Sequence, residues 1–187
     1  MLHEEIKTRR FNVEEYHRMG EVGILGEDDR VELVGGELVE MAPIGTRHLS
    51  CVVGLTHLLV EAASGRWFVS VQNPIRLGRR DEPEPDLSLL KAKPDPESQG
   101  PPGPEDVLLV VEVSDTTLSY DRNIKLPLYA RAAIPEVWIV DLNGRAVEVH
   151  SAVSPDGYRE SRSFGPGERV ASGTVEGLSI SVAEVLG

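Results

Sequence analysis

The chain has 187 residues and a formal net charge of −12, with 40% hydrophobic and 27% charged residues, as is typical of a globular protein with one substantial core. Its single cysteine, Cys51, excludes an internal disulfide and a multi-cysteine zinc site, and no apolar run is long enough to cross a bilayer. The acidity argues against a general basic surface for nucleic acid, although a local basic groove can coexist with an acidic surface, and a divalent cation would add positive charge of its own.

The first part of the chain predicts a helix and a hairpin. Residues 1–16 include basic residues but no apolar core, so they do not resemble a secretory signal, and we expect a cytoplasmic protein. Residues 11–20, FNVEEYHRMG, predict a short helix with Asn12 as its cap. Residues 31–41, VELVGGELVEM, place two extended runs around a Gly-Gly pair, which indicates a tight hairpin.

The middle of the chain predicts a helix followed by short strands. Apolar residues recur at helical spacing over 46–65, TRHLSCVVGLTHLLVEAASG, and the final glycine is a natural stop. Residues 67–72, WFVSVQ, and residues 86–90, DLSLL, have the composition of strands. Residues 91–106 are so rich in proline and polar side chains that we expect an exposed, mobile loop.

The second half of the chain predicts a strand, a helix and another strand. Residues 107–113, VLLVVEV, form an apolar strand, a helix lies within 120–133, and residues 137–141, VWIVD, form a second buried strand. Such a unit makes the two strands parallel, with a right-handed crossover. From Ala146 on, apolar and polar residues alternate, so we expect residues 145–183 to add antiparallel strands.

Glu112 is unusual because it interrupts an otherwise apolar strand. An unpaired carboxylate buried there would cost several kcal/mol. If strand 86–90 pairs antiparallel with strand 107–113, Asp86 lies beside Glu112, at the edge where such sheets build their sites. Lys125, early in the crossover helix, can then lean over both acids. Two carboxylates at one buried point repel each other unless a proton or a cation lies between them.

A hard divalent cation meets this requirement. Mg²⁺ accepts about one or two protein carboxylates, keeps several waters and binds phosphate oxygens readily. It can polarise a phosphoryl oxygen and lower the pKa of a bound water, and the ammonium of Lys125 could orient that water or offset developing charge. We therefore expect Asp86 and Glu112 to be metal ligands.

Several segments, taken in order, resemble the Uma branch of the restriction-endonuclease-like PD-(D/E)XK superfamily. The resemblance covers roughly residues 13–141 and rests on the segments VELVGGELVEMAP, RHLSCVVGLTHLL, PEPD, VVEVS, DRNIKLPLYA and IPEVWIVD. It implies an α-β-β-β-α-β core at about 46–141 and divalent-metal-dependent hydrolysis of phosphodiester bonds.

The resemblance also implies roles for individual residues. Asp86 and Glu112 match the acidic positions of the motif. Ser114 stands where the motif has lysine, and Lys125 on the following helix takes the place of that lysine. The family pattern adds two accessory residues, Glu32 and His48.

Simpler roles for these residues stay open at this stage. Asp86 could cap a turn after its proline, and Glu112 could pair with an arginine such as Arg76. Asp121, four residues before Lys125, could form an ordinary solvated pair with it.

The sequence thus predicts a mixed α/β (α+β) restriction-endonuclease-like domain over residues 1–187, with an N-terminal helix and hairpin and C-terminal antiparallel strands. One hypothesis is a nuclease that acts on DNA or RNA with Mg²⁺ or Mn²⁺, through Asp86, Glu112 and Lys125. The other is a catalytically silent nuclease fold that serves as a binding or assembly module. We expect nucleic acid as substrate and no membrane association, and by analogy with related nucleases a homodimer is plausible.

Overall fold

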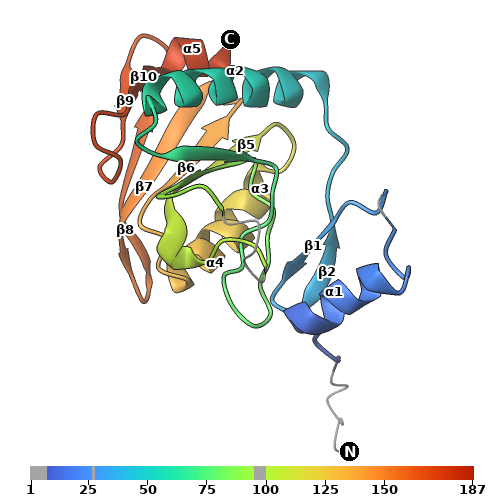
Figure 1. Cartoon of the computed structure of the whole chain (residues 1–187). Coiled ribbons are helices and arrows are strands. Elements are labelled where there is room, and N and C mark those ends of the chain that lie inside the picture. The colour runs from blue at the N-terminus through green and yellow to red at the C-terminus, as the bar shows by residue number, and fades with distance from the viewer. Residues whose placement is uncertain (1–7, 27, 95–99) are drawn as a thin grey trace, which may run out of the picture.

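A six-stranded mixed sheet with strand order β3-β4-β5-β6-β7-β8 forms the centre of the computed structural model, which describes residues 8–26, 28–94 and 100–187 (Figure 1). Its strands are β3 (Phe68–Val71), β4 (Leu87–Leu90), β5 (Val107–Ser114), β6 (Val137–Asp141), β7 (Ala146–Ser154) and β8 (Gly157–Phe164). Only β5 and β6 pair in parallel, and all other neighbours are antiparallel. The sheet confirms the predicted mixed α/β class.

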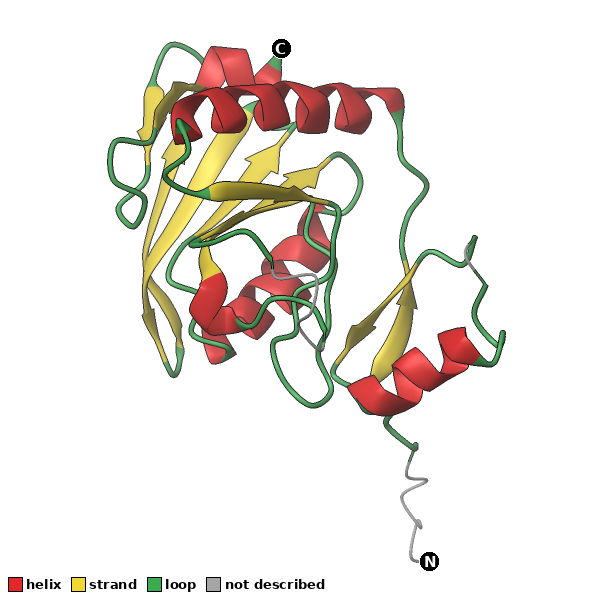
Figure 2. Ribbon diagram, viewed as in Figure 1, coloured by secondary structure: helices red, strands yellow, loops and turns green. Residues whose placement is uncertain are grey.

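Helices cover both faces of this sheet (Figure 2). One face packs against α2 (Thr46–Ala63) and α5 (Val182–Leu186), and a second apolar cluster on the other face includes residues of the β5–β6 crossover. Along β5, Leu109, Val111 and Val113 belong to the first cluster, whereas Val110 belongs to the second. Because strand side chains alternate, Glu112 points to the same face as Val110, toward the crossover helix.

The crossover helix begins earlier than the sequence suggested. It consists of α3 (Leu118–Tyr120), a wide π-helical turn (Asp121–Lys125) and α4 (Leu126–Arg131). Pro127 has no N–H to donate, and its ring crowds the carbonyl four residues before it. A turn that closes over five residues accommodates this proline without breaking the helix.

The N-terminal helix and hairpin lie beside the main sheet (Figure 1). They comprise α1 (Val13–Glu21), β1 (Val31–Val34) and β2 (Glu37–Glu40), and Asn12 caps α1 as predicted. A bridge between Leu33 and Glu82 ties β1 to the segment before β4. Gly36 in the hairpin turn has φ +77°, and a Cβ atom there would come within 2.8 Å of the Phe11 carbonyl oxygen, so glycine is required.

The C-terminal region only partly follows the prediction. Strands β7 and β8 extend the main sheet, but β9 (Arg169–Ala171) and β10 (Ser179–Ser181) form a separate two-stranded ribbon. In the loop predicted over 91–106, a short 3₁₀ helix occupies Pro104–Asp106, while 95–99 lie outside the described residues. Among the described helices, none has the length and apolarity needed to span a membrane.

Candidate active site

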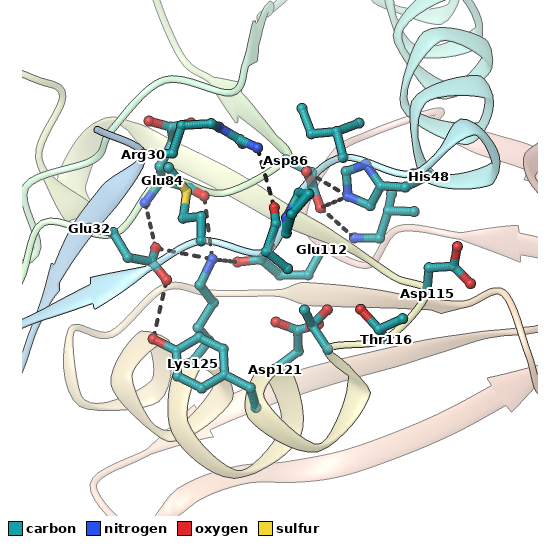
Figure 3. Close-up of a pocket in the computed structure, with 18 of the residues that line it drawn as sticks. Arg30, Glu32, His48, Glu84, Asp86, Glu112, Asp115, Thr116, Asp121 and Lys125 are labelled. Carbon is teal, nitrogen blue, oxygen red and sulfur yellow. Dashed lines mark hydrogen bonds and ion pairs between the residues drawn. The ribbon is translucent and has the colours of Figure 1, made fainter. Parts of the chain in front are cut away.

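The register of β4 and β5 brings Asp86 and Glu112 together. Leu87 pairs with Val111, so extending the ladder by one residue places Asp86 opposite Glu112. Residues directly opposite in an antiparallel pair point to the same face. The backbone N–H of Val113 donates to Asp86 Oδ2 at 2.8 Å, and both acids line one cavity of about 280 Å³ (Figure 3).

Lys125 reaches the same cavity from the crossover helix. Its Nζ atom lies 3.1 Å from Glu112 Oε1 and 3.2 Å from Glu32 Oε2, and the side chain is only 7% exposed. Asp121 does not pair with Lys125 at the surface but is buried, and accepts hydrogen bonds from Ser114 and Thr117, both at 2.7 Å. The solvated pair considered from the sequence is therefore wrong.

Glu112 is almost fully buried, and its carboxyl group is held by two donors. Lys125 is one, and the Tyr129 hydroxyl donates to Oε1 at 2.5 Å. Burial raises the pKa of Glu112 to about 8; Lys125 opposes this rise, while Asp121 and Asp86 add to it. Burial alone would lower the pKa of Lys125, but the charges of Glu112 and Glu32 outweigh burial and raise it, so the ammonium stays protonated.

His48 holds the carboxylate of Asp86 from the first turn of α2. Its Nε2 atom lies 3.0 Å from Oδ1 and 3.1 Å from Oδ2. This hydrogen bond raises the pKa of His48 above the usual imidazole value. Gln72 adds a weaker donor at 3.4 Å. Asp86 is thus fixed by side chains and by the backbone of the neighbouring strand.

Glu32 connects the N-terminal hairpin to this site. Besides Lys125, it accepts hydrogen bonds from the Tyr120 hydroxyl at 3.1 Å and from the Glu84 backbone N–H at 3.0 Å. Glu37, on the other hairpin strand, is exposed and pairs with Arg10. All five residues named from the sequence and the family pattern therefore line one cavity: Glu32, His48, Asp86, Glu112 and Lys125.

Comparison with known proteins identifies the family of this chain and a solved structure with a similar fold. The family model Uma2, described as a putative restriction endonuclease, matches residues 13–183. The chain belongs to the Uma2 family. Its fold is similar to the crystal structure of a putative nuclease of DUF820 from Anabaena variabilis, with a TM-score of 0.67 at 13% sequence identity, over 89% of this chain and 95% of that one. No curated protein matches the chain.

The Uma2 assignment confirms the resemblance noted in the sequence, but several polar residues of the cavity were not anticipated. They include Glu84, Tyr120, Asp121, Tyr129 and Arg30; all but Tyr129 line the cavity, and Tyr129 contacts it through Glu112. The spacing of two of these residues could have indicated that they lie near the site. Glu84 precedes Asp86 by two residues, a spacing that places both side chains on one face of an extended segment. Tyr129 follows Lys125 by four residues, a spacing that places both side chains on one face of a helix.

Arg76 does not compensate Glu112. It forms an ion pair with Glu14 of α1 instead, so the arginine pairing considered from the sequence is wrong. The carboxyl group of Glu112 depends on Lys125 and Tyr129.

The donor set of the cavity suits a hard divalent cation. Within the described residues, no three carboxylate, thiol or imidazole groups converge closely enough to hold a metal ion by themselves. Mg²⁺ does not require three, because it keeps most of its waters and takes about one or two carboxylates. Crowding of like charges also favours a cation, since Asp86 and other acids raise the pKa of Glu84 and Glu112 in addition to burial. Asp86 and Glu112 supply the number and kind of side-chain oxygen ligands that such an ion takes.

Proposed function

We propose that this Uma2 protein is a nuclease that hydrolyses phosphodiester bonds of nucleic acid with Mg²⁺ or Mn²⁺. The observation that supports it most directly is the convergence of Asp86, Glu112 and Lys125 in one cavity of a nuclease-like fold. Asp86 directly precedes β4, Glu112 lies in β5, and Lys125 lies in the helix that follows β5.

In this proposal Asp86 and Glu112 hold the cation. A bound divalent cation supplies Lewis acidity toward a phosphoryl oxygen and neutralises part of the phosphate charge. His48 and the Val113 N–H keep the Asp86 carboxylate oriented, as hydrogen bonds to ligating carboxylates commonly do.

Lys125 stabilises negative charge in the proposed reaction. Because its pKa is raised, it carries a full positive charge at neutral pH and does not act as a general base. A fixed and almost fully buried ammonium such as that of Lys125 stabilises charge that builds on a phosphate more strongly than an ammonium in solvent does. Glu32 limits the movement of this ammonium from the side of the hairpin.

A catalytically silent binding or assembly module is the second candidate. One observation favours it: Lys125 and Tyr129 already satisfy Glu112, whose pKa near 8 keeps much of it protonated at neutral pH. A cation would have to displace that proton before Glu112 could bind it.

Cleavage assays separate the two candidates. Plasmid and single-stranded DNA are incubated with Mg²⁺ or Mn²⁺, and with EDTA as the metal-free control. We expect metal-dependent cleavage by the wild type that is lost in Asp86→Asn and Glu112→Gln. The matched substitutions Asp156→Asn and Glu160→Gln, at exposed positions, should keep it. Equal activity in the wild type and the two site variants would indicate a contaminating nuclease and would refute the proposed nuclease activity of this protein.

A further inference from the structure

The cavity around Asp86 is lined by many acidic side chains and by few basic ones. Seven Asp and Glu side chains line it, among them Glu40, Glu84 and Asp115. The lysine and arginine side chains that line it are Lys125, which is bound to two carboxylates, and Arg30. Duplex DNA carries one negative charge for about every 1.7 Å of its axis, and proteins that bind it neutralise several phosphates with Lys and Arg. This cavity offers no such row of cations, so recognition there depends on contacts other than the neutralisation of many phosphates.

One wall of the cavity is apolar. It consists of Val39, Met41, Ala42, Pro43 and Ile44, which belong to β2 and to the connection that leads into α2. Ile44 is 42% exposed, so this wall is open to a ligand. In a duplex the faces of the bases are stacked inside, and a protein meets mainly sugar, phosphate and base edges. An apolar surface beside a scissile phosphate instead fits the exposed face of an unpaired base.

Arg30 is hydrogen-bonded to the backbone of this wall, and its guanidinium group has further N–H donors that a ligand could use. Its backbone oxygen accepts a hydrogen bond from the Met41 N–H at 2.9 Å, and its Nη1 donates to the Ala42 carbonyl at 3.3 Å. A guanidinium has five N–H donors, and no ion pair to Arg30 is formed within residues 8–26, 28–94 and 100–187. Figure 3 shows Arg30 close to Glu84, on the other side of the cavity from His48.

We propose that the site takes single-stranded nucleic acid, with one unpaired nucleotide against the Met41–Ile44 wall and an adjoining phosphate on Arg30. The proposal rests on the proposed nuclease function and specifies its substrate class. The cavity volume of about 280 Å³ is close to the lower end of small-ligand pockets, as expected for part of one nucleotide rather than for a duplex.

Binding and cleavage are measured separately on the full chain. Fluorescence anisotropy with a labelled single-stranded oligonucleotide and with its blunt duplex, both in Ca²⁺, measures affinity without relying on turnover. Cleavage in Mg²⁺ or Mn²⁺ uses the same two substrates and a duplex with a single-stranded tail. We expect about tenfold or greater preference for the single strand in both assays, and cuts confined to the tail in the third substrate.

Two isoleucine substitutions test the apolar wall. Ile44→Asp places a charge on the wall and should weaken single-strand binding by about tenfold or more. The matched control is Ile24→Asp, an isoleucine that is 68% exposed and does not line the cavity, and it should stay within about twofold of the wild type. Thermal unfolding verifies that both variants are folded. Arg30→Met removes one phosphate contact and should reduce the slope of log affinity against log salt by about 0.7.

The outcomes distinguish this inference from the function on which it rests. Equal or tighter binding and cleavage of the duplex would overturn the single-strand inference and leave the nuclease in place. Selective binding of the single strand without cleavage of any substrate would support the nucleotide site and overturn the nuclease. Equal effects of Ile44→Asp and Ile24→Asp would overturn the assignment of the wall.

Discussion

The ammonium of Lys125 lies 3.1 Å from the carboxylate of Glu112, although the two residues belong to a helix and to the strand before it. The related motif has its lysine two residues after the acid, where this chain has Ser114. Ser114 is buried and donates to Asp121 one turn before Lys125. The serine therefore fixes the start of the helix that delivers the lysine to the same acid.

Replacing Lys125 should affect both stability and activity. Lys125→Met leaves the Glu32 carboxylate buried without its cation and removes one of the two donors to Glu112, and breaking a buried pair in this way costs about 3–5 kcal/mol. If the proposed function holds, cleavage should fall by about a hundredfold or more, the usual loss when one charge-stabilising donor is removed. Urea unfolding and initial rates measure the two effects. Lys91→Met, an exposed lysine, is the control, and wild-type stability of Lys125→Met would contradict the buried pairing.

The raised pKa of Glu112 predicts that stability decreases as pH rises. The ordinary carboxyl pKa of 4.5 applies in the unfolded chain, whereas burial raises the folded value to about 8. Between these values the folded state binds a proton that the unfolded state has lost, so this contribution is complete below pH 4.5 and disappears as pH passes 8. Glu112→Gln cannot titrate and should show a flatter profile. Urea midpoints at about pH 5, 6.5 and 8 measure the slopes, and parallel profiles would rule the prediction out.

Protonation of Glu112 should also oppose metal binding. Metal affinity should therefore increase with pH, whereas stability decreases. A carboxyl group must lose its proton before it can bind a cation. If Glu112 is a ligand, Mn²⁺ affinity should therefore increase with pH up to about 8, the pKa that burial produces. Titration calorimetry at several pH values tests this, with Glu112→Gln as the variant that loses the dependence. A pH-independent affinity in the wild type would remove Glu112 from the ligand set.

His48 should act through Asp86. His48→Ala removes the donor that orients the Asp86 carboxylate, and losses of such partners typically reduce metal affinity by about 10–100-fold. His57→Ala is a matched control on the same helix, because His57 is exposed and makes only a long contact of 3.9 Å with Glu61. Mn²⁺ calorimetry compares the two variants. Similar affinities in both would show that Asp86 does not depend on His48.

Glu32 should anchor the hairpin to the sheet. Glu32→Gln weakens the contact with Lys125 and disturbs acceptors used by Tyr120 and Glu84, so we expect a destabilisation of about 1–3 kcal/mol. Glu37→Gln, in the same hairpin but exposed, should change stability by less than about 0.5 kcal/mol. The difference between the urea midpoints of the two variants measures how much the contacts of Glu32 stabilise the protein. Equal midpoints would mean that other contacts hold the hairpin against the sheet.

The sequence alone determined most of the elements and their order, although not the separate ribbon of β9 and β10. Short-range patterns were sufficient for the Asn12 cap, the helix over 46–63 and the apolar strand that ends near Glu112. The strand-helix-strand unit also fixed the parallel pairing of β5 with β6. From this topology the proximity of Asp86 and Glu112 followed, because antiparallel neighbours bring the start of one strand beside the end of the other.

Only the tertiary structure decided which charged residues are buried and with what partners. The four-residue spacing of Asp121 and Lys125 fits a solvent-exposed ion pair as well as two buried groups. The two are buried here because β5 and the hairpin pack over them. Tyr129 lies fully buried in the core, yet its hydroxyl also donates a hydrogen bond to Glu112. Burial depends on which elements lie against a side chain, and those contacts join residues far apart in the chain, which local sequence patterns do not specify.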